Sequence, residues 1–268
     1  MRRRLAPVLE GRTLARVEIG DARLTRPLDP VEVAAELDGE RVALVDRRGK
    51  YLIVRFESGR ALLVHLRMTG SFLLGGEDDP HRRAVLTLDD GTRLAYRDVR
   101  RFGTWLLLEP GGVDAYLDAR VGREPLAAAY RSKHLAERLA GRRAPVKAAL
   151  LDQRTVAGVG NIYADEALWR ARVHPLTPAL ALGPAKVSAV YRGVRDALRA
   201  GIRRQGSTLR DYRLPDGEPG GAQHEFRVYG RGGEPCDRCG TPIDKIRVAG
   251  RGTWYCPACQ RYTSGALP

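Results

Sequence analysis

All four cysteines of the chain lie within one short stretch near its C-terminus. Cys236 and Cys239 form a Cys-x2-Cys pair, and Cys256 and Cys259 form a second pair after a spacer of sixteen residues. This spacing lets both thiolates of a pair reach one ion, and four thiolates complete the tetrahedral coordination of zinc. A segment this short buries too little apolar surface to fold alone. The pattern therefore predicts one structural Zn²⁺ ion, and the alternative is two disulfides.

The spacer between the cysteine pairs predicts a β-hairpin. Its run KIRVAGRGTWYC, residues 245–256, places β-branched and aromatic residues on either side of Gly250 and Gly252. We expect the tip of the hairpin to be basic and to carry Lys245, Arg247 and Arg251.

The charge balance of the whole chain is strongly basic. The 268 residues contain 46 Lys+Arg against 32 Asp+Glu, a formal net charge of +14, and nearly all of the basic residues are arginine. Arginine binds phosphate through two parallel hydrogen bonds, so this excess favours a polyanionic partner. The alternative is an arginine-rich solvated surface. The chain has no apolar run of membrane-spanning length and no signal-peptide core at its start, so we expect a soluble, cytoplasmic protein without membrane contacts.

The N-terminal half has the pattern of a β-protein. Between residues 41 and 109, short apolar runs alternate with turn sequences such as RRGK, ESGR and DDG, which is typical of an antiparallel sandwich or barrel. A short helix over 2–10, a strand over 13–20 and a helix begun by Asp29-Pro30 precede this block. The sequence Pro-Gly-Gly at 110–112 closes it.

The following part, residues 113–206, has helical periodicity. Residues 207–235 are polar and rich in glycine and proline, which indicates a loop, with EFRVYG at 225–230 as a candidate strand. The expected helices cover 132–139, 145–152, 161–171 and 184–204.

Several residues have side chains suited to DNA. Gly158 and Gly160 precede Asn161 at a helix start, where free N–H groups attract phosphate, and Lys147 adds a cation. The alternatives are that Asn161 only caps a helix beginning at Ile162 and that Lys147 is solvated. Apolar side chains such as Met68 and Phe102 can fill the gap left by an extruded base, and Arg100 can contact its orphaned partner. The alternatives are core positions for Met68 and Phe102 and a solvated surface for the arginine.

Together these stretches resemble the formamidopyrimidine-DNA glycosylases of the Fpg/Nei superfamily. The matching motifs follow the family order and cover nearly the whole chain. The resemblance implies an α+β fold: an antiparallel β-sandwich over 1–112, a helical domain with a helix–two-turn–helix motif over 113–222, and a zinc finger over 223–268. The motifs are RRGKYL, HLRMTG, YRDVRRFG, VAGVGNIYADEAL, QGSTLRDY, VYGRGGEPC and RGTWYCPACQ.

The resemblance also implies roles for single residues. Asn161, Lys147 and Arg251 hold phosphates at the damaged site, and Arg251 assists the second elimination. Met68, Arg100 and Phe102 fill the gap, and Arg100 contacts the orphaned cytosine. Two further residues match the family's motifs: His81 contacts DNA and Lys50 assists catalysis. The loop at 207–219 matches the segment that closes over the flipped base.

One departure concerns the start of the chain. The family's mature chain opens with a proline, whose amine attacks C1′, and a glutamate, which transfers protons; here the sequence opens MRRRLAPVLEG, which matches the inside of the family's first helix. We expect that a gene model has begun at an internal valine codon. The alternative is a chain that has lost its nucleophile.

The resemblance therefore implies a bifunctional DNA glycosylase and abasic-site lyase. Its expected partner is double-stranded damaged DNA, and its expected substrates are oxidised purines such as 8-oxoguanine and formamidopyrimidines, as the RRF and HLRM motifs favour. We expect a bacterial, monomeric protein that is nucleoid-associated when bound to DNA. The rival interpretations are a catalytically impaired damaged-DNA-binding protein of the same fold and an RNA-binding zinc-ribbon protein.

Overall fold

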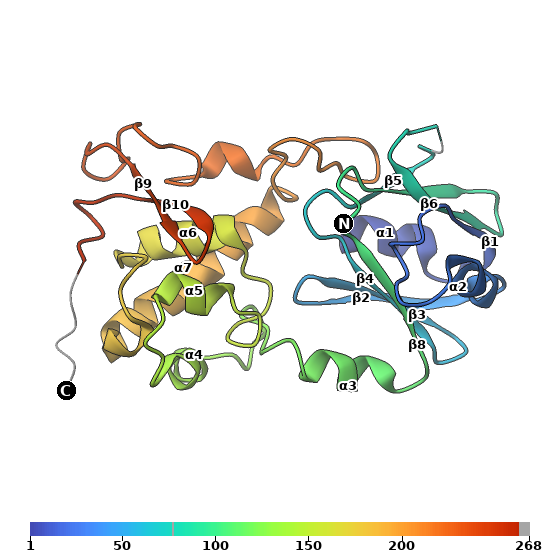
Figure 1. Cartoon of the computed structure of the whole chain (residues 1–268), viewed down its shortest axis with the longest axis horizontal. Coiled ribbons are helices and arrows are strands. Elements are labelled where there is room, and N and C mark those ends of the chain that lie inside the picture. The colour runs from blue at the N-terminus through green and yellow to red at the C-terminus, as the bar shows by residue number, and fades with distance from the viewer. Residues whose placement is uncertain (77, 263–268) are drawn as a thin grey trace. The chain divides into compact units, whose positions relative to one another are not determined.

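The computed structural model describes residues 1–76 and 78–262, and these residues form two compact units (Figure 1). The first unit comprises Met1–Ala119 together with Gln205–Gln223, and the second comprises Arg120–Arg204 together with the described residues from His224 onward. The loop that follows the last long helix therefore groups with the N-terminal unit. The three domain ranges expected from the sequence stay a prediction, and residues 263–268 of the expected zinc finger lie outside the described residues.

The first unit contains two four-stranded antiparallel sheets, so the expected antiparallel β-structure is confirmed (Figure 1). One sheet has the order β1-β6-β7-β5 and the other β2-β3-β4-β8. The strands of the first are β1 (Leu14–Ile19), β6 (Arg82–Leu88), β7 (Arg93–Arg97) and β5 (Ser71–Leu74). The strands of the second are β2 (Val42–Arg48), β3 (Tyr51–Phe56), β4 (Ala61–His65) and β8 (Thr104–Leu108).

The two sheets share one hydrophobic core. Successive side chains of a strand point to opposite faces, and in β8 this places Trp105 and Leu107 in the core. The Trp105 ring meets Tyr96 of β7 at 5.4 Å and Phe72 of β5 at 6.0 Å between centroids, which joins one sheet to the other. Aromatic contacts of this kind add to the free energy gained by burial alone.

Three helices complete the first unit: α1 (Arg2–Leu9), α2 (Pro30–Leu37) and α3 (Gly112–Asp118). The Asp29 carboxylate caps α2 by accepting the Val31 N–H at 2.7 Å, as its sequence predicts. The α3 helix was not predicted; its N-cap is Gly111, so no capping side chain marks the start of the helix.

The second unit is helical, and the four expected helices are confirmed. They share one core, to which α6 and α7 contribute the buried faces that pack against each other. Among the described residues, no helix combines the length and the hydropathy that crossing a bilayer requires. The helices are α4 (Ser132–Leu139), α5 (Val146–Leu151), α6 (Asn161–Ala171) and α7 (Pro184–Arg203), with a short 3-10 turn η1 (Ala179–Ala181) before α7.

The expected hairpin is formed by β9 (Asp244–Val248) and β10 (Arg251–Tyr255). Ala249 and Gly250 make the turn, both with positive φ. Arg247 and Arg251 lie beside this turn as predicted. The placement of Lys245 at the tip was wrong: it pairs with Trp254 toward the other end of the hairpin, and its ammonium lies 5.2 Å from the Trp254 ring centroid.

The predicted strand at 225–230 was also wrong. The segment begins with the end of a 3-10 turn, η2 (Ala222–Glu225), and continues as bends and turns. The backbone N–H groups of Arg227, Val228 and Tyr229 donate to one oxygen of Glu166 at 2.8, 2.9 and 3.2 Å. These three N–H groups therefore donate to a buried carboxylate on α6 instead of to a neighbouring strand.

Candidate nucleic-acid interface and metal centre

The four cysteines converge on one point beside the hairpin. Their sulfur atoms all lie within 4.8 Å of one another, and Cys239 Sγ lies 3.5 Å from Cys256 Sγ and 3.4 Å from Cys259 Sγ. A zinc ion with four bonds of about 2.3 Å to sulfur needs sulfurs roughly 3.8 Å apart, so the arrangement fits one structural Zn²⁺. The disulfide alternative is wrong, because all four thiols are free and these separations far exceed the ~2.05 Å of an S–S bond.

The metal centre is attached to α6 through Trp169. The Trp169 indole N–H donates to Cys236 Sγ at 3.4 Å, and the Arg238 guanidinium lies 4.0 Å from the Trp169 ring centroid. A hydrogen bond to a coordinating thiolate orients it and stabilises its charge. Trp169 also packs with Val228, Ile243 and two of the cysteines in a small core of the zinc module.

In the first unit, one end of the sheet β2-β3-β4-β8 gathers several of the predicted residues. Tyr51 of β3 pairs with His65 of β4, and His65 pairs with Thr104 of β8. Lys50 directly precedes Tyr51, and Met68 follows His65 by three residues. The segment 100–103 directly precedes Thr104. Pairing between strands therefore brings together three loops that are distant in sequence.

The Asp98 carboxylate joins two of these loops. It accepts from the Thr69 hydroxyl and from the Gly103 N–H at 2.7 Å, and Thr69 Oγ1 in turn accepts the Arg100 N–H at 3.1 Å. The Asp98 N–H donates to the His81 carbonyl at 3.0 Å, so the His81 loop is fixed to the same residue. Asp98 is 1% exposed, and the sequence analysis did not single it out.

Met68, Arg100 and Phe102 are brought together as predicted. Arg100 Nη1 lies 3.1 Å from Met68 Sδ, and its guanidinium lies 4.8 Å from the Phe102 ring centroid. Met68 is 63% exposed and Phe102 is 51% exposed, so the alternative that both are core residues is wrong. Two large apolar side chains held in solvent around an arginine suit insertion into a base stack.

Two glycines allow the loops to close around the Tyr96 side chain. A Cβ atom on Gly70 would lie 2.4 Å from Tyr96 Oη, and one on Gly103 would lie 1.9 Å from it. Only glycine permits such close approach. The glycines of HLRMTG and RRFG are thus required where the loops carrying Met68 and Phe102 return to the sheet.

His65 fixes the turn that leads to Met68, a role that the sequence analysis did not foresee. Its Nδ1 accepts the N–H of Arg67 at 3.0 Å, and Arg67 has the unusual φ of 54°. Burial, with smaller effects from the charges of Arg67 and Lys50, lowers the pKa of His65 to about 4. The imidazole is therefore neutral at physiological pH, as an acceptor at Nδ1 must be.

Lys50, His81 and the loop 206–220 also belong to the first unit. Lys50 is exposed in the turn between β2 and β3, and the roles of Lys50 and His81 stay predictions. The loop is attached to the sheet by the Leu74 N–H, which donates to the Pro215 carbonyl at 2.7 Å. Leu209 is exposed within it.

The second unit brings together Lys147, Asn161 and the residues beside Arg251. Lys147 Nζ and Asn161 Nδ2 both donate to the Gly252 carbonyl, at 3.1 and 3.0 Å. Two predicted residues, on α5 and α6, therefore meet at the backbone carbonyl of the residue that follows Arg251 in β10. Asn161 does not cap a helix from Ile162, as had been an alternative, because α6 begins at Asn161 itself with Gly160 as its N-cap.

Lys147 is fully buried, so the alternative of a solvated lysine is wrong. Its ammonium lies 2.6 Å from Asp165 Oδ1 and donates to Thr253 Oγ1 at 2.7 Å as well as to Gly252. Burial lowers the pKa of Lys147, and burial raises the pKa of Asp165 to about 6. For both groups the loss of hydration outweighs the attraction between them, which is usual for a buried ion pair.

The glycine-bearing connection before α6 is organised by Gln153. Its Nε2 donates to the Leu151 and Val159 carbonyls at 3.0 and 2.9 Å, and its Oε1 accepts the Gly158 N–H at 3.0 Å. One side chain thus satisfies three backbone groups and fixes the approach to Asn161.

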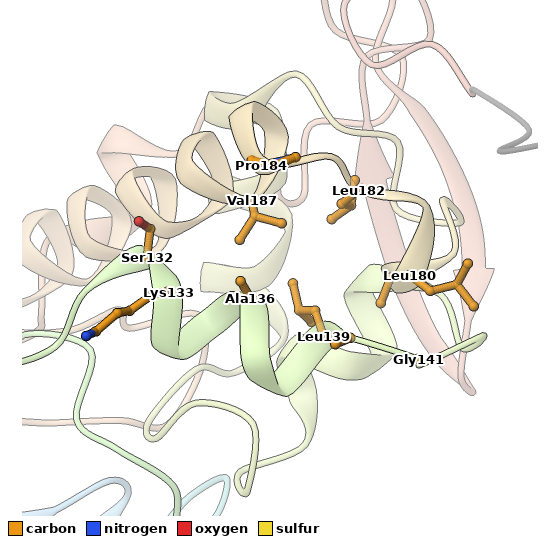
Figure 2. Close-up of a pocket in the computed structure, with 11 residues that line it drawn as sticks. Ser132, Lys133, Ala136, Leu139, Gly141, Leu180, Leu182, Pro184 and Val187 are labelled. Atoms are coloured by element: carbon orange, nitrogen blue, oxygen red, sulfur yellow. The ribbon is translucent and has the colours of Figure 1, made fainter. Parts of the chain in front are cut away.

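A separate groove of about 540 Å³ lies between α4 and the start of α7 (Figure 2). Aliphatic side chains such as Ala136, Leu139, Leu182 and Val187 line it, with Lys133 at its edge. None of the predicted site residues contributes to this groove.

Three family models match successive parts of the chain. Residues 1–105 match the formamidopyrimidine-DNA glycosylase N-terminal domain, residues 121–213 match the H2TH domain of the same enzymes, and residues 233–261 match the zinc finger found in FPG and IleRS. The chain belongs to the formamidopyrimidine-DNA glycosylase family. Members of this family are DNA glycosylases of base excision repair.

Individual relatives match over almost their full length. Formamidopyrimidine-DNA glycosylase of Chloroflexus aurantiacus is 46% identical over 265 residues, which cover 96% of this chain and 94% of the relative. The crystal structure of MutM (Fpg) from Thermus thermophilus is similar with a TM-score of 0.88 at 44% identity, covering 98% and 96% of the two chains. Fpg of Lactococcus lactis, solved with DNA containing Fapy-dG, has a TM-score of 0.88 at 36% identity and covers 97% of each chain.

The family membership confirms the expected fold class and the zinc finger. The helical part is an H2TH domain, and the four cysteines at its C-terminal side are placed to bind one metal ion. The solved relatives include complexes with damaged DNA.

Proposed function

We propose that this protein removes oxidised purines, namely 8-oxoguanine and formamidopyrimidines, from duplex DNA and cleaves the resulting abasic site by β,δ-elimination. The observation that carries the proposal is the exposed group of Met68, Arg100 and Phe102, held by Asp98 beside a β-sheet. The complex of the Lactococcus lactis relative with Fapy-dG DNA supports the choice of lesion. We further propose a monomer that acts in the bacterial cytoplasm on nucleoid DNA.

Each group of residues has a defined part in this proposal. Met68 and Phe102 occupy the space of the extruded nucleotide, and the Arg100 guanidinium donates to the orphaned cytosine. Lys147 and Arg251 attract the phosphates beside the lesion through their positive charges, and the Asn161 amide adds a neutral hydrogen-bond donor. His81 adds a phosphate contact, and Lys50 assists the chemistry near the lesion.

In this structure the N–H donors of Lys147 are directed at protein oxygens, so its contribution is chiefly a positive charge. The zinc ion, when bound, keeps the hairpin folded and contributes no reaction step. The loop 206–220 is proposed to close over the extruded base.

The first test measures affinity for a duplex containing a tetrahydrofuran abasic analogue, compared with the undamaged duplex. Replacing Met68 and Phe102 by alanine should reduce the preference for the damaged duplex by about tenfold or more, since base–aromatic stacking contributes about 1–3 kcal/mol per base. Val31→Ala, which shortens another exposed apolar side chain, on α2, is the control. Equal affinity of the unmodified protein for both duplexes would contradict the proposed function.

The second test concerns the nucleophile. Borohydride traps the imine between an amine and an abasic sugar, so covalent trapping reports the lyase step. We expect covalent trapping of the protein on a duplex that contains an abasic site. Preferential binding to the lesion without any trapping would contradict the lyase step and would identify a damaged-DNA-binding protein.

A further inference from the structure

Asp165 lies where α5, α6 and the zinc hairpin meet, and none of the roles proposed above uses it. Its Oδ1 lies 2.6 Å from Lys147 Nζ on α5, and its Oδ2 accepts the Trp254 N–H of β10 at 3.1 Å. The residue is 1% exposed. One carboxylate therefore contacts both a candidate phosphate-binding lysine and the backbone of the strand that begins with Arg251.

The contacts around Asp165 fix β10 residue by residue. Gly252 is held through its carbonyl by Lys147 and Asn161, Thr253 through its hydroxyl by Lys147, and Trp254 through its N–H by Asp165. The Thr253 hydroxyl also donates to the Arg251 carbonyl at 3.0 Å. These bonds leave the backbone on the C-terminal side of Arg251 with little freedom.

We propose that Asp165 is a positioning residue that determines where the zinc hairpin presents Arg251 relative to Lys147 and Asn161. The inference rests on the proposed function, in which these three residues contact phosphate. The carboxylate is required in this position for two reasons. It is the anionic partner of a fully buried ammonium, and it is the acceptor for a strand N–H that faces away from β9.

An asparagine at position 165 tests the charge with almost no change in size. Its side-chain oxygen can still accept the Trp254 N–H, but its amide N–H groups would then point at the Lys147 ammonium. Two hydrogen-bond donors would then face each other, which disfavours the present position of the Lys147 ammonium. The two hydrogen bonds that Lys147 donates to Gly252 and Thr253 should be weakened as a result. Asp165→Asn should therefore displace Arg251 while the zinc site itself remains intact.

The experiment is a double-mutant cycle on the zinc-loaded chain, read as affinity for the tetrahydrofuran duplex. Arg251→Ala alone should weaken binding about tenfold, the loss expected for one hydrogen bond to a charged phosphate. Asp165→Asn alone should cause a similar loss, and adding Arg251→Ala to it should change affinity less than about twofold. Asp196→Asn is the control, because it makes the same change of charge on an exposed residue of α7.

Two results of this double-mutant cycle would contradict the positioning role of Asp165. Equal losses from Arg251→Ala with and without Asp165→Asn, at unchanged zinc content, would overturn the inference, and so would a negligible effect of Arg251→Ala alone. If Asp165→Asn does not fold, the uncharged pair Lys147→Met with Asp165→Leu takes its place in the cycle, since replacing a buried ion pair by apolar residues is often tolerated. Failure of the unmodified chain to prefer the damaged duplex would instead refute the proposed function.

Discussion

The Glu166 carboxylate should be a principal attachment of the zinc module to the helical unit. One of its oxygens accepts three backbone N–H groups, those of residues 227–229, and the other accepts from Arg170 at 2.8 Å. A hydrogen bond to a charged acceptor contributes about 1.5–3 kcal/mol, whereas one to a neutral acceptor contributes about 0.5–1.5 kcal/mol. In Glu166→Gln the three N–H bonds should therefore lose roughly 1 kcal/mol each, about 3 kcal/mol together.

The amide group of the new glutamine adds a second cost, because its N–H groups would face the Arg170 guanidinium. The assay is hydrogen exchange of the backbone amides at 227–229 in the zinc-loaded chain. A loss of about 3 kcal/mol in local opening free energy should accelerate their exchange by about two orders of magnitude. Glu137→Gln, an exposed glutamate of α4, is the control. Unchanged exchange at 227–229 in Glu166→Gln would refute this assignment of the attachment.

Further predictions concern the metal, the exposed apolar residues and pH. Chelation of zinc should abolish protection of β9 and β10 against hydrogen exchange and leave the sheets of the first unit protected, because only the hairpin depends on the metal; equal loss in both units would contradict this. Met68→Ala and Phe102→Ala should change the free energy of unfolding by less than about 0.5 kcal/mol each, since both side chains are exposed, and denaturant titration measures this. The His65 imidazole should titrate near pH 4 when followed by NMR. Because its pKa in the folded protein lies below the ordinary 6.5, its contribution to stability is present above pH 6.5 and is lost as the pH falls toward 4. A titration midpoint near 6.5 would show that the imidazole is not buried.

The sequence predicted the elements of this fold well because the signals for them are local. Alternation of apolar residues and short turn sequences defined the strands, and the caps and periodicity defined four of the helices within one or two residues. The Cys-x2-Cys pairs identified the metal centre for the same reason, because a spacing of two residues lets both thiolates of a pair bind one ion. The α3 helix was missed, since it follows Pro-Gly-Gly and no capping side chain marks its start.

The failures concern residues whose partners are distant in sequence. Asn161 has the properties of a helix cap, but its amide donates to Gly252, which lies 91 residues away. EFRVYG has the composition of a strand, but its backbone is bound by Glu166, some 60 residues away. Lys147 is an ordinary lysine in sequence, and only the folded chain shows its buried partner, Asp165. Local propensity contains no information about such tertiary partners.

One regularity of the sequence does indicate these contacts in retrospect. Asn161, Asp165 and Trp169 are spaced by four residues, so they lie on one face of α6. Each contacts the zinc module: Asn161 donates to a carbonyl of β10, Asp165 accepts an N–H of β10, and Trp169 donates to a cysteine sulfur. This polar and aromatic stripe on α6 thus marks the surface on which the zinc module sits.

The metal and the α6 stripe have different effects on the zinc module. The metal determines whether the hairpin is folded, whereas the α6 face determines where the folded hairpin lies. Loss of zinc should therefore expose the strand amides of β9 and β10, while substitution on the stripe should leave those amides protected and alter only what the hairpin presents. Because Arg251 sits at the end of β10 nearest Asn161, its placement depends on the stripe even when the metal site is complete.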